Sequence, residues 1–207
     1  KGVPLALCGI ASDVTEKHLY LNMLKRQNSA NHLLVELSRK FLRSQPKSID
    51  SVIDSCLSDL GDFLHLDRAC LFVIDADQKL FSNSHEWCRE GVESQQDKLQ
   101  NKDLSSAPAF MQEIRNHRMI CLDDLQRSHP QWLKERMLLQ LKDIKALLAA
   151  PLVLDELLLG FIGFDMMQQT RIWDEVDFMV IQVVADLLAA TFERLEYVVV
   201  SPTASCP

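Results

Sequence analysis

The chain has 207 residues, 47% of them hydrophobic, and a formal net charge of −7. This length suits one domain with a full core plus extensions, and the acidic balance argues against a nucleic-acid-binding surface. The longest uninterrupted apolar stretch is far shorter than the roughly 20 residues of a membrane span, so no membrane-spanning segment is expected. Six scattered cysteines without a C-x-x-C pair, and no signal peptide at the start, predict a reduced, cytoplasmic protein.

The start of the chain predicts a strand followed by a long helix. Residues 1–11 have the apolar pattern of a single strand, and Asp13 with Glu16 forms a capping box where a helix begins. This helix is expected to run from Val14 to about Arg43. Its apolar residues alternate steps of three and four, which is the spacing of a coiled-coil seam. The predicted seam comprises Tyr20, Met23, Gln27, Ala30, Leu34, Leu37 and Phe41.

Two interpretations of this seam stay open. A partner helix would make the chain a homodimer around a two-fold axis, with Gln27 fixing the register. The outer face of the last helix, with Val180, Val183 and Leu187 as candidates, would add a second contact. The alternative is an amphipathic helix that packs on its own domain. The partner helix is favoured, because the apolar stripe extends through a linker with no sheet beside it.

The remaining sequence predicts a mixed fold. Two apolar runs around the acidic turn 155–156 predict a central β-hairpin buried on both faces. Acids at 174, 175 and 177 suit the positive end of the dipole of the apolar helix that follows. The expected helices are residues 48–66, 107–116, 130–141 and 178–190, and the expected strands are 69–74, 80–88, 118–122, 146–154 and 157–165. This order predicts an α+β fold with an antiparallel sheet of five or six strands.

Several blocks of sequence together resemble a known family. They are residues 67–72, 82–88, 120–125, 147–152, 159–165 and 171–175. Their order and spacing resemble a GAF domain of bacterial PAS- and GAF-containing signalling proteins, over residues 33–196. The resemblance implies a GAF-like antiparallel sheet with the terminal helices on one face, and short helices or loops over a ligand pocket on the other.

The N-terminal residues resemble a second family. Gly2-Val3-Pro4 and Asp13-Val14-Thr15-Glu16-Lys17 resemble the end of a PAS domain, which implies that the chain is a piece of a longer multidomain protein. The expected organisation is a PAS remnant at 1–17, a linker helix at 18–46, a GAF domain at 47–196 and a tail of uncertain origin at 197–207.

The GAF resemblance implies sensing without catalysis. No Ser, Cys or His sits in a Gly-flanked elbow and no Gly-rich phosphate loop is present, so no catalytic residues are expected. In relatives with a His-Glu-Trp-Cys strand, the output domain that follows the GAF domain is commonly a GGDEF or EAL cyclic-di-GMP domain, and next most often a histidine kinase. A diguanylate cyclase, a phosphodiesterase or a histidine kinase is therefore expected as the full-length protein. The alternative is a structural dimerisation and relay module without a ligand.

Strand alternation suggests which residues face a ligand. Asn83, His85 and Trp87 share one face of an extended strand and mix polar groups with an aromatic wall. They are expected to face the pocket, under a roof made by residues 107–125. Cys121 and Asp123, within this roof, complete the predicted ligand-binding set. The opposite orientation, with Trp87 and Phe81 in the helix-packed core, also stays open.

No cofactor is identified from the sequence. His85 and Cys88 would point to opposite faces of a strand, so they could share a metal ion only across a bulge, and no metal site is expected. A bilin thioether would need an exposed cysteine, whereas Cys121 lies inside an apolar strand without a chromophore motif. Haem ligation by His117 or His129 stays open.

A partial match to the cyclic-nucleotide signature of phosphodiesterase GAF domains is also present. It consists of Asn101-Lys102 and Phe161-x-x-x-Asp165. The final acid of the signature falls on Met166, and packing within a strand explains Phe161. Cyclic-nucleotide binding is therefore not expected.

Overall fold

The computed structural model describes residues 15–127, 132, 135 and 143–195. Four predicted features lie outside these residues, wholly or almost so: the strand at 1–11, the Asp13 cap, the helix at 130–141 and the tail at 197–207. The other predicted helices and strands are all present, with the bounds given below.

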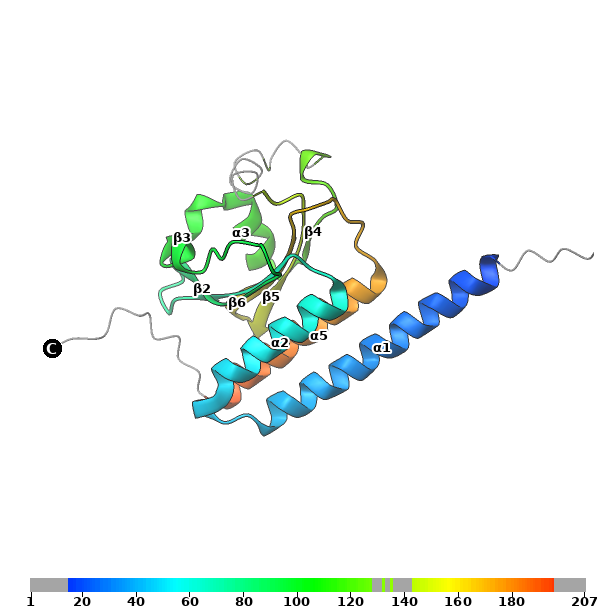
Figure 1. The fold of residues 1–207 in the computed structure, drawn as a ribbon. Coiled ribbons are helices and arrows are strands. Elements are labelled where there is room, and N and C mark those ends of the chain that lie inside the picture. Colours follow the sequence, from blue (N-terminus) through cyan, green and yellow to red (C-terminus); the bar gives the residue numbers. More distant parts are fainter. Residues whose placement is uncertain (1–14, 128–131, 133–134, 136–142, 196–207) are drawn as a thin grey trace, which may run out of the picture.

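One antiparallel sheet of six strands forms the centre of the fold (Figure 1). The strand order is β3-β2-β1-β6-β5-β4. The strands are β1 (Arg68–Ile74), β2 (Leu80–Cys88), β3 (Lys102–Asp103), β4 (Ile120–Leu122), β5 (Ala146–Leu154) and β6 (Leu157–Met166). The predicted α+β class and sheet size are confirmed. Strand β3 is an addition, because the polar sequence around it carries no strand pattern.

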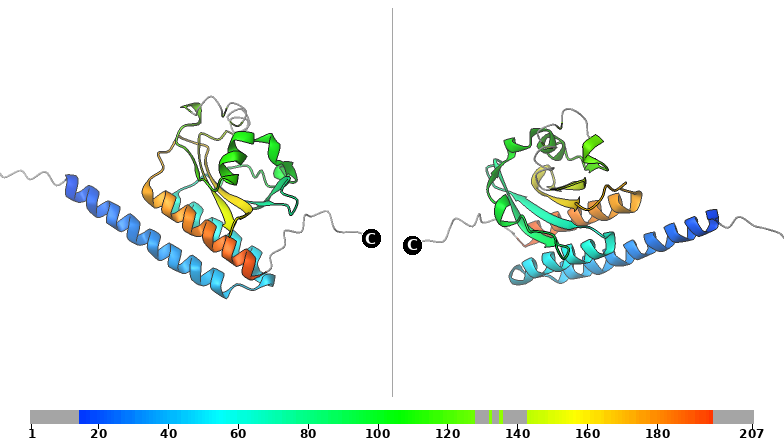
Figure 2. Two further views of the ribbon diagram at one scale, coloured as in Figure 1. Left: turned by 180° about the vertical axis from the view of Figure 1, so that it is seen from behind. Right: turned by 45° about the horizontal axis from the view of Figure 1, so that its top comes forward.

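Three long helices of the described chain form two layers on one side of the sheet (Figures 1 and 2). α2 (Ile49–Leu64) packs on β1 and β2, and α5 (Glu175–Arg194) packs on β5. α1 (Thr15–Arg43) packs on α5 and α2 and forms the outer layer. The other face of the sheet is covered by α3 (Pro108–Arg115) and by loops. The predicted division between terminal helices and short roof elements is thus confirmed.

The helix side of the sheet holds the larger core. Alternate strand residues point toward α2 and α5, among them the fully buried Leu71, Leu148 and Phe164. Val184 and Leu188 of α5 lie in the same cluster. Burying one side chain of this size contributes roughly 1.5–3 kcal/mol, so this layer is the main source of hydrophobic stabilisation.

Local sequence accounts for the start of α5. The carboxylate of Asp174 accepts hydrogen bonds from the backbone N–H groups of Val176 and Asp177, each at 3.0 Å. Asp177 accepts one in return from the N–H of Asp174, also at 3.0 Å. This reciprocal capping box satisfies donors that have no partner within the helix.

Half of the seam predicted on α1 belongs to the domain itself. Ala30, Leu34, Leu37 and Phe41 are all buried in the helix-side core. The prediction that these four residues contact a partner helix is wrong, because α2 and α5 already supply their apolar surroundings. The alternative, an amphipathic helix packed on its own domain, describes this half of α1.

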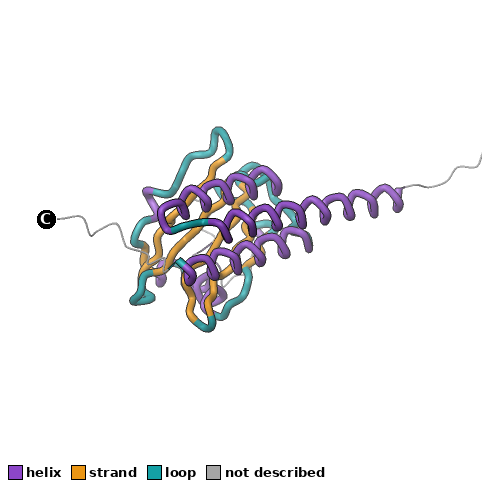
Figure 3. The backbone as a smooth tube through the Cα atoms, turned by 90° about the horizontal axis from the view of Figure 1, so that it is seen from below, coloured by secondary structure: helices purple, strands orange, loops and turns teal. Residues whose placement is uncertain are grey.

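The beginning of α1 is different. Tyr20 and Met23 are 62% and 69% exposed, and Gln27 is also exposed. Figure 3 shows α1 extending beyond the other two long helices at its N-terminal end. On α5, Val180 is fully buried, so it does not lie on an outward face as predicted, because it points into the core shared with α1 and the sheet.

Candidate ligand pocket

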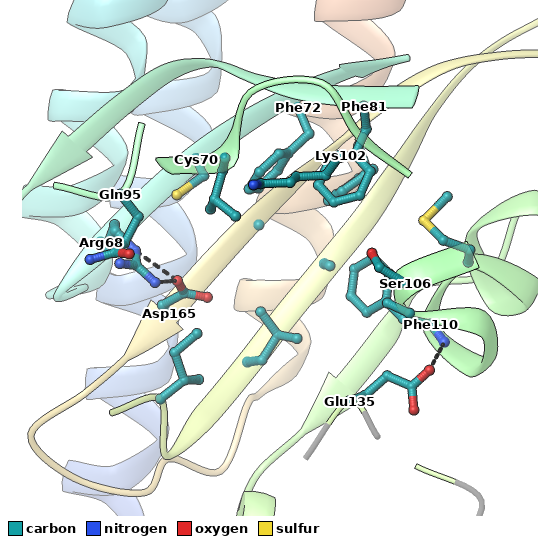
Figure 4. A pocket seen from close by; sticks show the side chains of 18 of the residues that line it. Arg68, Cys70, Phe72, Phe81, Gln95, Lys102, Ser106, Phe110, Glu135 and Asp165 are labelled. Carbon is teal, nitrogen blue, oxygen red and sulfur yellow. Dashed lines mark hydrogen bonds and ion pairs between the residues drawn. The ribbon is translucent and has the colours of Figure 1, made fainter. Parts of the chain in front are cut away.

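A pocket of about 430 Å³ lies on the sheet face opposite α2 and α5 (Figure 4). Three neighbouring strands make its floor with alternate residues. These are Arg68, Cys70 and Phe72 of β1, Phe161, Gly163 and Asp165 of β6, and Leu147 and Ala149 of β5. The segment 95–107 and α3 cover it. The volume falls within the range of small-molecule sites.

Four phenylalanines give this pocket an aromatic wall. The rings of Phe72 and Phe161 are stacked, with centroids 4.6 Å apart. Phe81 and Phe110 contact Phe161 with centroid separations of 5.9 and 5.2 Å. Because these rings come from β1, β2, β6 and α3, the wall connects the floor of the pocket to its roof.

Gly163 is the reason that the floor is hollow. A methyl group at this position would meet no atom within 4 Å. Ala149, which faces Gly163 across the β5–β6 ladder, also lines the pocket. Two small residues side by side on the same face therefore leave room that larger side chains would fill.

Arg68 forms a charged end of the pocket. Its Nε and Nη2 donate to Oδ2 of Asp165 at 2.9 and 2.6 Å, and Nε lies 3.8 Å from Oε1 of Glu86. The side chain is only 2% exposed, and Nη1 has no hydrogen-bond partner among the described residues. Burial lowers the pKa of the guanidinium, but the nearby carboxylates outweigh it and raise this pKa above its ordinary value. The group stays charged.

Glu86 connects strand β2 to the loop that covers this end. Its Oε2 accepts hydrogen bonds from the backbone N–H groups of Gln95 and Gln96, at 2.8 and 3.2 Å, and from the hydroxyl of Ser94. The Glu86 side chain is 1% exposed. A buried carboxylate that accepts several hydrogen bonds is stable in place, so Glu86 fixes the loop above the pocket.

The far side of the pocket carries Glu135 and the lysine from β3. Oε1 of Glu135 accepts hydrogen bonds from the backbone N–H groups of Ala109 and Phe110, at 2.7 and 3.4 Å, near the start of α3. Figure 4 places Glu135 across the pocket from Arg68, and it shows the Lys102 side chain reaching over the phenylalanine rings. The pocket therefore combines an aromatic centre with charged groups at its margins.

His85 and Trp87 do not face this pocket, so their predicted orientation is wrong. A methyl group at Gly61 of α2 would lie 2.2–2.5 Å from the Trp87 ring, and Nε2 of His85 lies 3.3 Å from Oδ1 of Asp50 on α2. The alternative, the helix-packed core, is correct for Trp87 but wrong for Phe81, which lines the pocket because it precedes the bulge in β2. Burial lowers the pKa of His85, opposed by the charges of Asp54 and Asp50.

A β-bulge explains the error. In the β1–β2 ladder, Phe72 lies opposite Asn83 but Leu71 lies opposite His85, so Ser84 is an extra residue. One extra residue reverses the alternation of all side chains that follow it. Asn83, before the bulge, is on the pocket side of β2, where its amide donates to Oε1 of Glu86 at 3.1 Å. It supports the floor without lining the pocket.

Cys121 and Asp123 also lie away from the pocket lining. Cys121 pairs with the core residue Leu148 across the β4–β5 ladder, and it is exposed rather than buried in the strand. Its thiol has a pKa raised to about 12 by partial burial and by the charge of Asp123, whose Oδ1 is 3.5 Å from Sγ. Asp123 accepts hydrogen bonds from the backbone N–H groups of Trp173 and Arg171, each at 3.1 Å.

Asp123 is thereby part of a polar network that reaches α1. Asp177 is 1% exposed, and its Oδ1 accepts hydrogen bonds from Nη2 of Arg171 and Nη2 of Arg26, both at 2.7 Å. Arg26 also pairs with Asp174. The network joins the end of β4, the loop before α5, the first turn of α5 and α1.

The important pocket residues are ones for which the sequence assigned no ligand role. Arg68 and Glu86 lie in strands, where a buried charge must have a partner. This rule could have indicated from the sequence that the two residues belong to a site. Lys102, Phe161 and Asp165 of the discounted nucleotide signature do line the pocket. These residues are far apart in the sequence, so the sequence alone does not show that they line one pocket.

Among the described residues there is neither a metal centre nor a membrane-spanning helix. Within residues 15–127, 132, 135 and 143–195, no three His, Cys, Asp or Glu side chains are placed to hold a metal ion. The helices of this same part of the chain are too short or too polar to cross a bilayer.

One curated relative resembles nearly the whole chain. It is the methanogenesis regulatory histidine kinase FilI of Methanothrix harundinacea (strain 6Ac), which is 30% identical over 206 residues. The match covers 94% of this chain but only 22% of FilI, so the chain spans about a fifth of that relative.

Solved structures share the fold at low sequence identity. The phycocyanobilin-bound GAF domain from a cyanobacterial phytochrome is 13% identical with a TM-score of 0.67, covering 81% of this chain and 96% of that one. The GAF domain of a phosphoenolpyruvate-protein phosphotransferase from Coxiella burnetii is 17% identical with a TM-score of 0.64, covering 83% and 96%. The family model of the GAF domain matches residues 48–192. The chain belongs to the GAF domain family.

Proposed function

We propose that this chain is the ligand-sensing part of a signal-transduction protein. The observation that carries the proposal is the pocket of about 430 Å³, left open on one face of an otherwise well-packed sheet. A ligand that binds there would bias the loop held by Glu86, and the helices on the other face would transmit the change. The bilin-bound phytochrome domain, a structural neighbour, supports the use of this fold for ligands.

A histidine kinase is the proposed output. The support is the FilI relative, whose name describes a regulatory histidine kinase. The comparisons offer no support for the cyclic-di-GMP output that the sequence favoured. The four described cysteines, at 56, 70, 88 and 121, are free thiols, in keeping with a cytoplasmic location.

The polar network on α1 is the proposed route of the signal. β4 places Ile120 in the apolar cluster on the pocket side of the sheet and ends at Leu122, just before Asp123. Asp123 holds the loop before α5, and Asp177 joins that loop to Arg26 on α1. A shift of β4 would therefore reach the contacts of α1 through Arg171 and Asp177.

A homodimer through the outer face of α1 completes the proposal. Leu21, Leu24, Val35 and Leu42 are 40%, 43%, 48% and 73% exposed. Leu21, Val35 and Leu42 recur at multiples of seven residues, on the side of the helix that points away from Leu34 and Leu37. This stripe replaces the seam inferred from the sequence. Two copies of α1 could bury it around a two-fold axis.

Native mass spectrometry of the purified chain tests the pocket. We expect a bound small molecule that is absent from the Gly163→Val variant, because the valine side chain would project into the hollow floor, where a Cβ atom meets nothing within 4 Å. A folded wild-type chain that never retains or binds any small molecule, in any cell extract offered, would support the structural relay module instead.

Sedimentation analysis tests the dimer. Leu24→Asp should give a folded monomer, because Leu24 lies outside the domain core. Leu157→Asp, which replaces a leucine of β6 that is 53% exposed, is the control and should leave the assembly unchanged. A Leu24→Asp chain that stays dimeric would remove this face of α1 from the proposal.

A further inference from the structure

The chemistry of the pocket lining narrows the class of ligand, on the assumption that the pocket is the sensory site proposed above. The centre of the pocket is apolar. Phe72, Phe81, Phe110 and Phe161 surround it, with ring centroids 4.6–5.9 Å apart in the contacting pairs. A flat apolar body of about one ring would fit against these faces and edges, above the open space at Gly163.

Three cations and two carboxylates line the margin of the pocket, and Glu86 and Glu93 lie next to two of these cations. Arg68, Lys98 and Lys102 line the pocket together with Asp165 and Glu135. Asp165 binds Arg68 with one oxygen, and Lys98 is paired with Glu93 at 2.7 Å. Lys102 has no ion pair among the described residues. In Figure 4 its side chain extends across the aromatic rings.

Arg68 supplies a second, independent indication. Its guanidinium is 2% exposed and lines the pocket, yet Nη1 has no hydrogen-bond partner in the described part of the chain. A buried donor without a partner is costly, and a ligand oxygen would satisfy it. Arg68 thus calls for an acceptor at the edge of an aromatic space, and the exposed Lys102 adds a second positive charge there.

Glu135 is the residue that could favour a cationic ligand. One of its oxygens is occupied by the N–H groups at the start of α3, and the other has no partner among the described residues. The positive end of that helix already compensates its charge. Of the three lining cations, Lys102 therefore remains without an ion pair among the described residues.

We propose that the pocket binds a small aromatic carboxylate, with its ring among the four phenylalanines and its carboxylate bound by Lys102 and Nη1 of Arg68. The carboxylate would offer the acceptor that Nη1 of Arg68 lacks and would pair with the exposed Lys102, in charge-assisted hydrogen bonds. Neutral amides of the same shape would keep the ring contacts and lose the charge.

Four probes of related size test this class on the whole 207-residue chain. They are 3-phenylpropionate, 3-phenylpropanamide, 3-phenylpropylamine and succinate, titrated by calorimetry. We expect 3-phenylpropionate to bind about tenfold more tightly than its amide. The amine and the ring-less succinate should bind more weakly still.

Two variants locate the charge. Lys102→Met should weaken 3-phenylpropionate binding about tenfold and leave the amide unchanged. Lys25→Met changes the net charge equally but lies on α1, so it should have no effect. Gly163→Val should abolish binding of the acid while the chain keeps its circular dichroism spectrum and melting temperature.

Several results would overturn the assignment. Equal binding of acid and amide, tighter binding of the amine, or equal effects of the two lysine variants would contradict a carboxylate at Lys102. Undiminished acid binding by Gly163→Val would place the ligand elsewhere. If no probe binds but native mass spectrometry finds another molecule lost in Gly163→Val, the ligand class is wrong and the sensory function stands. If neither is found, both fail.

Discussion

The two faces of the sheet come from alternate residues of the same strands, yet one face is filled and the other is hollow. On the helix side, Leu71, Leu148 and Phe164 meet apolar residues of α2 and α5 and are fully buried. On the other side, the neighbouring positions include Cys70 and Gly163, which are small. The difference in side-chain volume, not in backbone, creates the pocket.

The covers of the two faces differ as well. α2 and α5 hold the helix face through apolar packing along their whole lengths. The loop that covers one end of the pocket is held by discrete polar contacts, such as those of Glu86 to the N–H groups of Gln95 and Gln96, whereas α3 packs through apolar residues. A closely packed apolar layer resists any displacement of its side chains, whereas a few hydrogen bonds can be replaced by hydrogen bonds to a ligand or to water. This contrast suits one face for stability and the other for response.

Adjacent leucines of β5 give the sharpest test of this contrast. Leu148→Ala on the helix side should cost about 2–5 kcal/mol of unfolding free energy, because it leaves a cavity in a close-packed core. Leu147→Ala on the pocket side should cost roughly 1 kcal/mol, since part of its surroundings is already empty. Urea unfolding measures both. Equal losses would show that the two faces are packed alike.

Two glycines of β6 provide a second matched pair. A methyl group at Gly160 would lie 2.1 Å from the backbone oxygen of Phe72, whereas one at Gly163 would contact nothing within 4 Å. Gly160→Ala should therefore lose roughly 1–3 kcal/mol in thermal or urea unfolding. Gly163→Ala should stay within about 0.5 kcal/mol of the wild type. A larger loss at Gly163 would mean that the floor is not open.

The contact of α2 with β2 should show a smaller effect. Gly61→Ala places a methyl group 2.2–2.5 Å from the Trp87 ring. Because a side chain can move more easily than a backbone, we expect a loss near 1 kcal/mol. Trp87→Leu in the same chain should recover part of it by removing the ring, measured as a double-mutant cycle. Simple additivity of the two substitutions would argue that Trp87 does not pack on Gly61.

The smallest expected effect is the titration of His85 on the helix side. Burial lowers its folded pKa below the usual value near 6.5, against the opposing charges of Asp54 and Asp50. As the pH falls below about 6.5, the unfolded chain binds the proton first, so stability should decrease until the lower folded pKa is reached. Above about pH 6.5 His85 is neutral in both the folded and the unfolded chain, so its protonation costs no stability. His85→Gln should flatten this part of the stability profile, and an unchanged slope would contradict it.

Much of the architecture follows from local sequence. The 3.6-residue periodicity of α1 and α2, the paired apolar runs of β5 and β6, and the Asp174 capping box are each encoded within a few neighbouring residues. Such patterns depend on the geometry of a single helix or strand. They were therefore available before any tertiary contact was known.

The candidate site depended on contacts between distant segments. The bulge at Ser84 turns His85 and Trp87 toward α2, and nothing in the alternation of β2 alone reveals it. The pocket also joins Arg68, Lys102 and Glu135 from separate parts of the chain.

The sequence by itself determined most of the described helices and strands and the α+β class, because periodicity and capping are local, and its ordered blocks indicated the family; β3 carried no strand pattern. Only the tertiary structure decided which face of β2 meets α2 and that half of the α1 stripe belongs to the domain's own core. It also decided where the pocket lies. Register, bulges and packing partners are set by the summed free energy of contacts across the whole fold, which no single stretch contains.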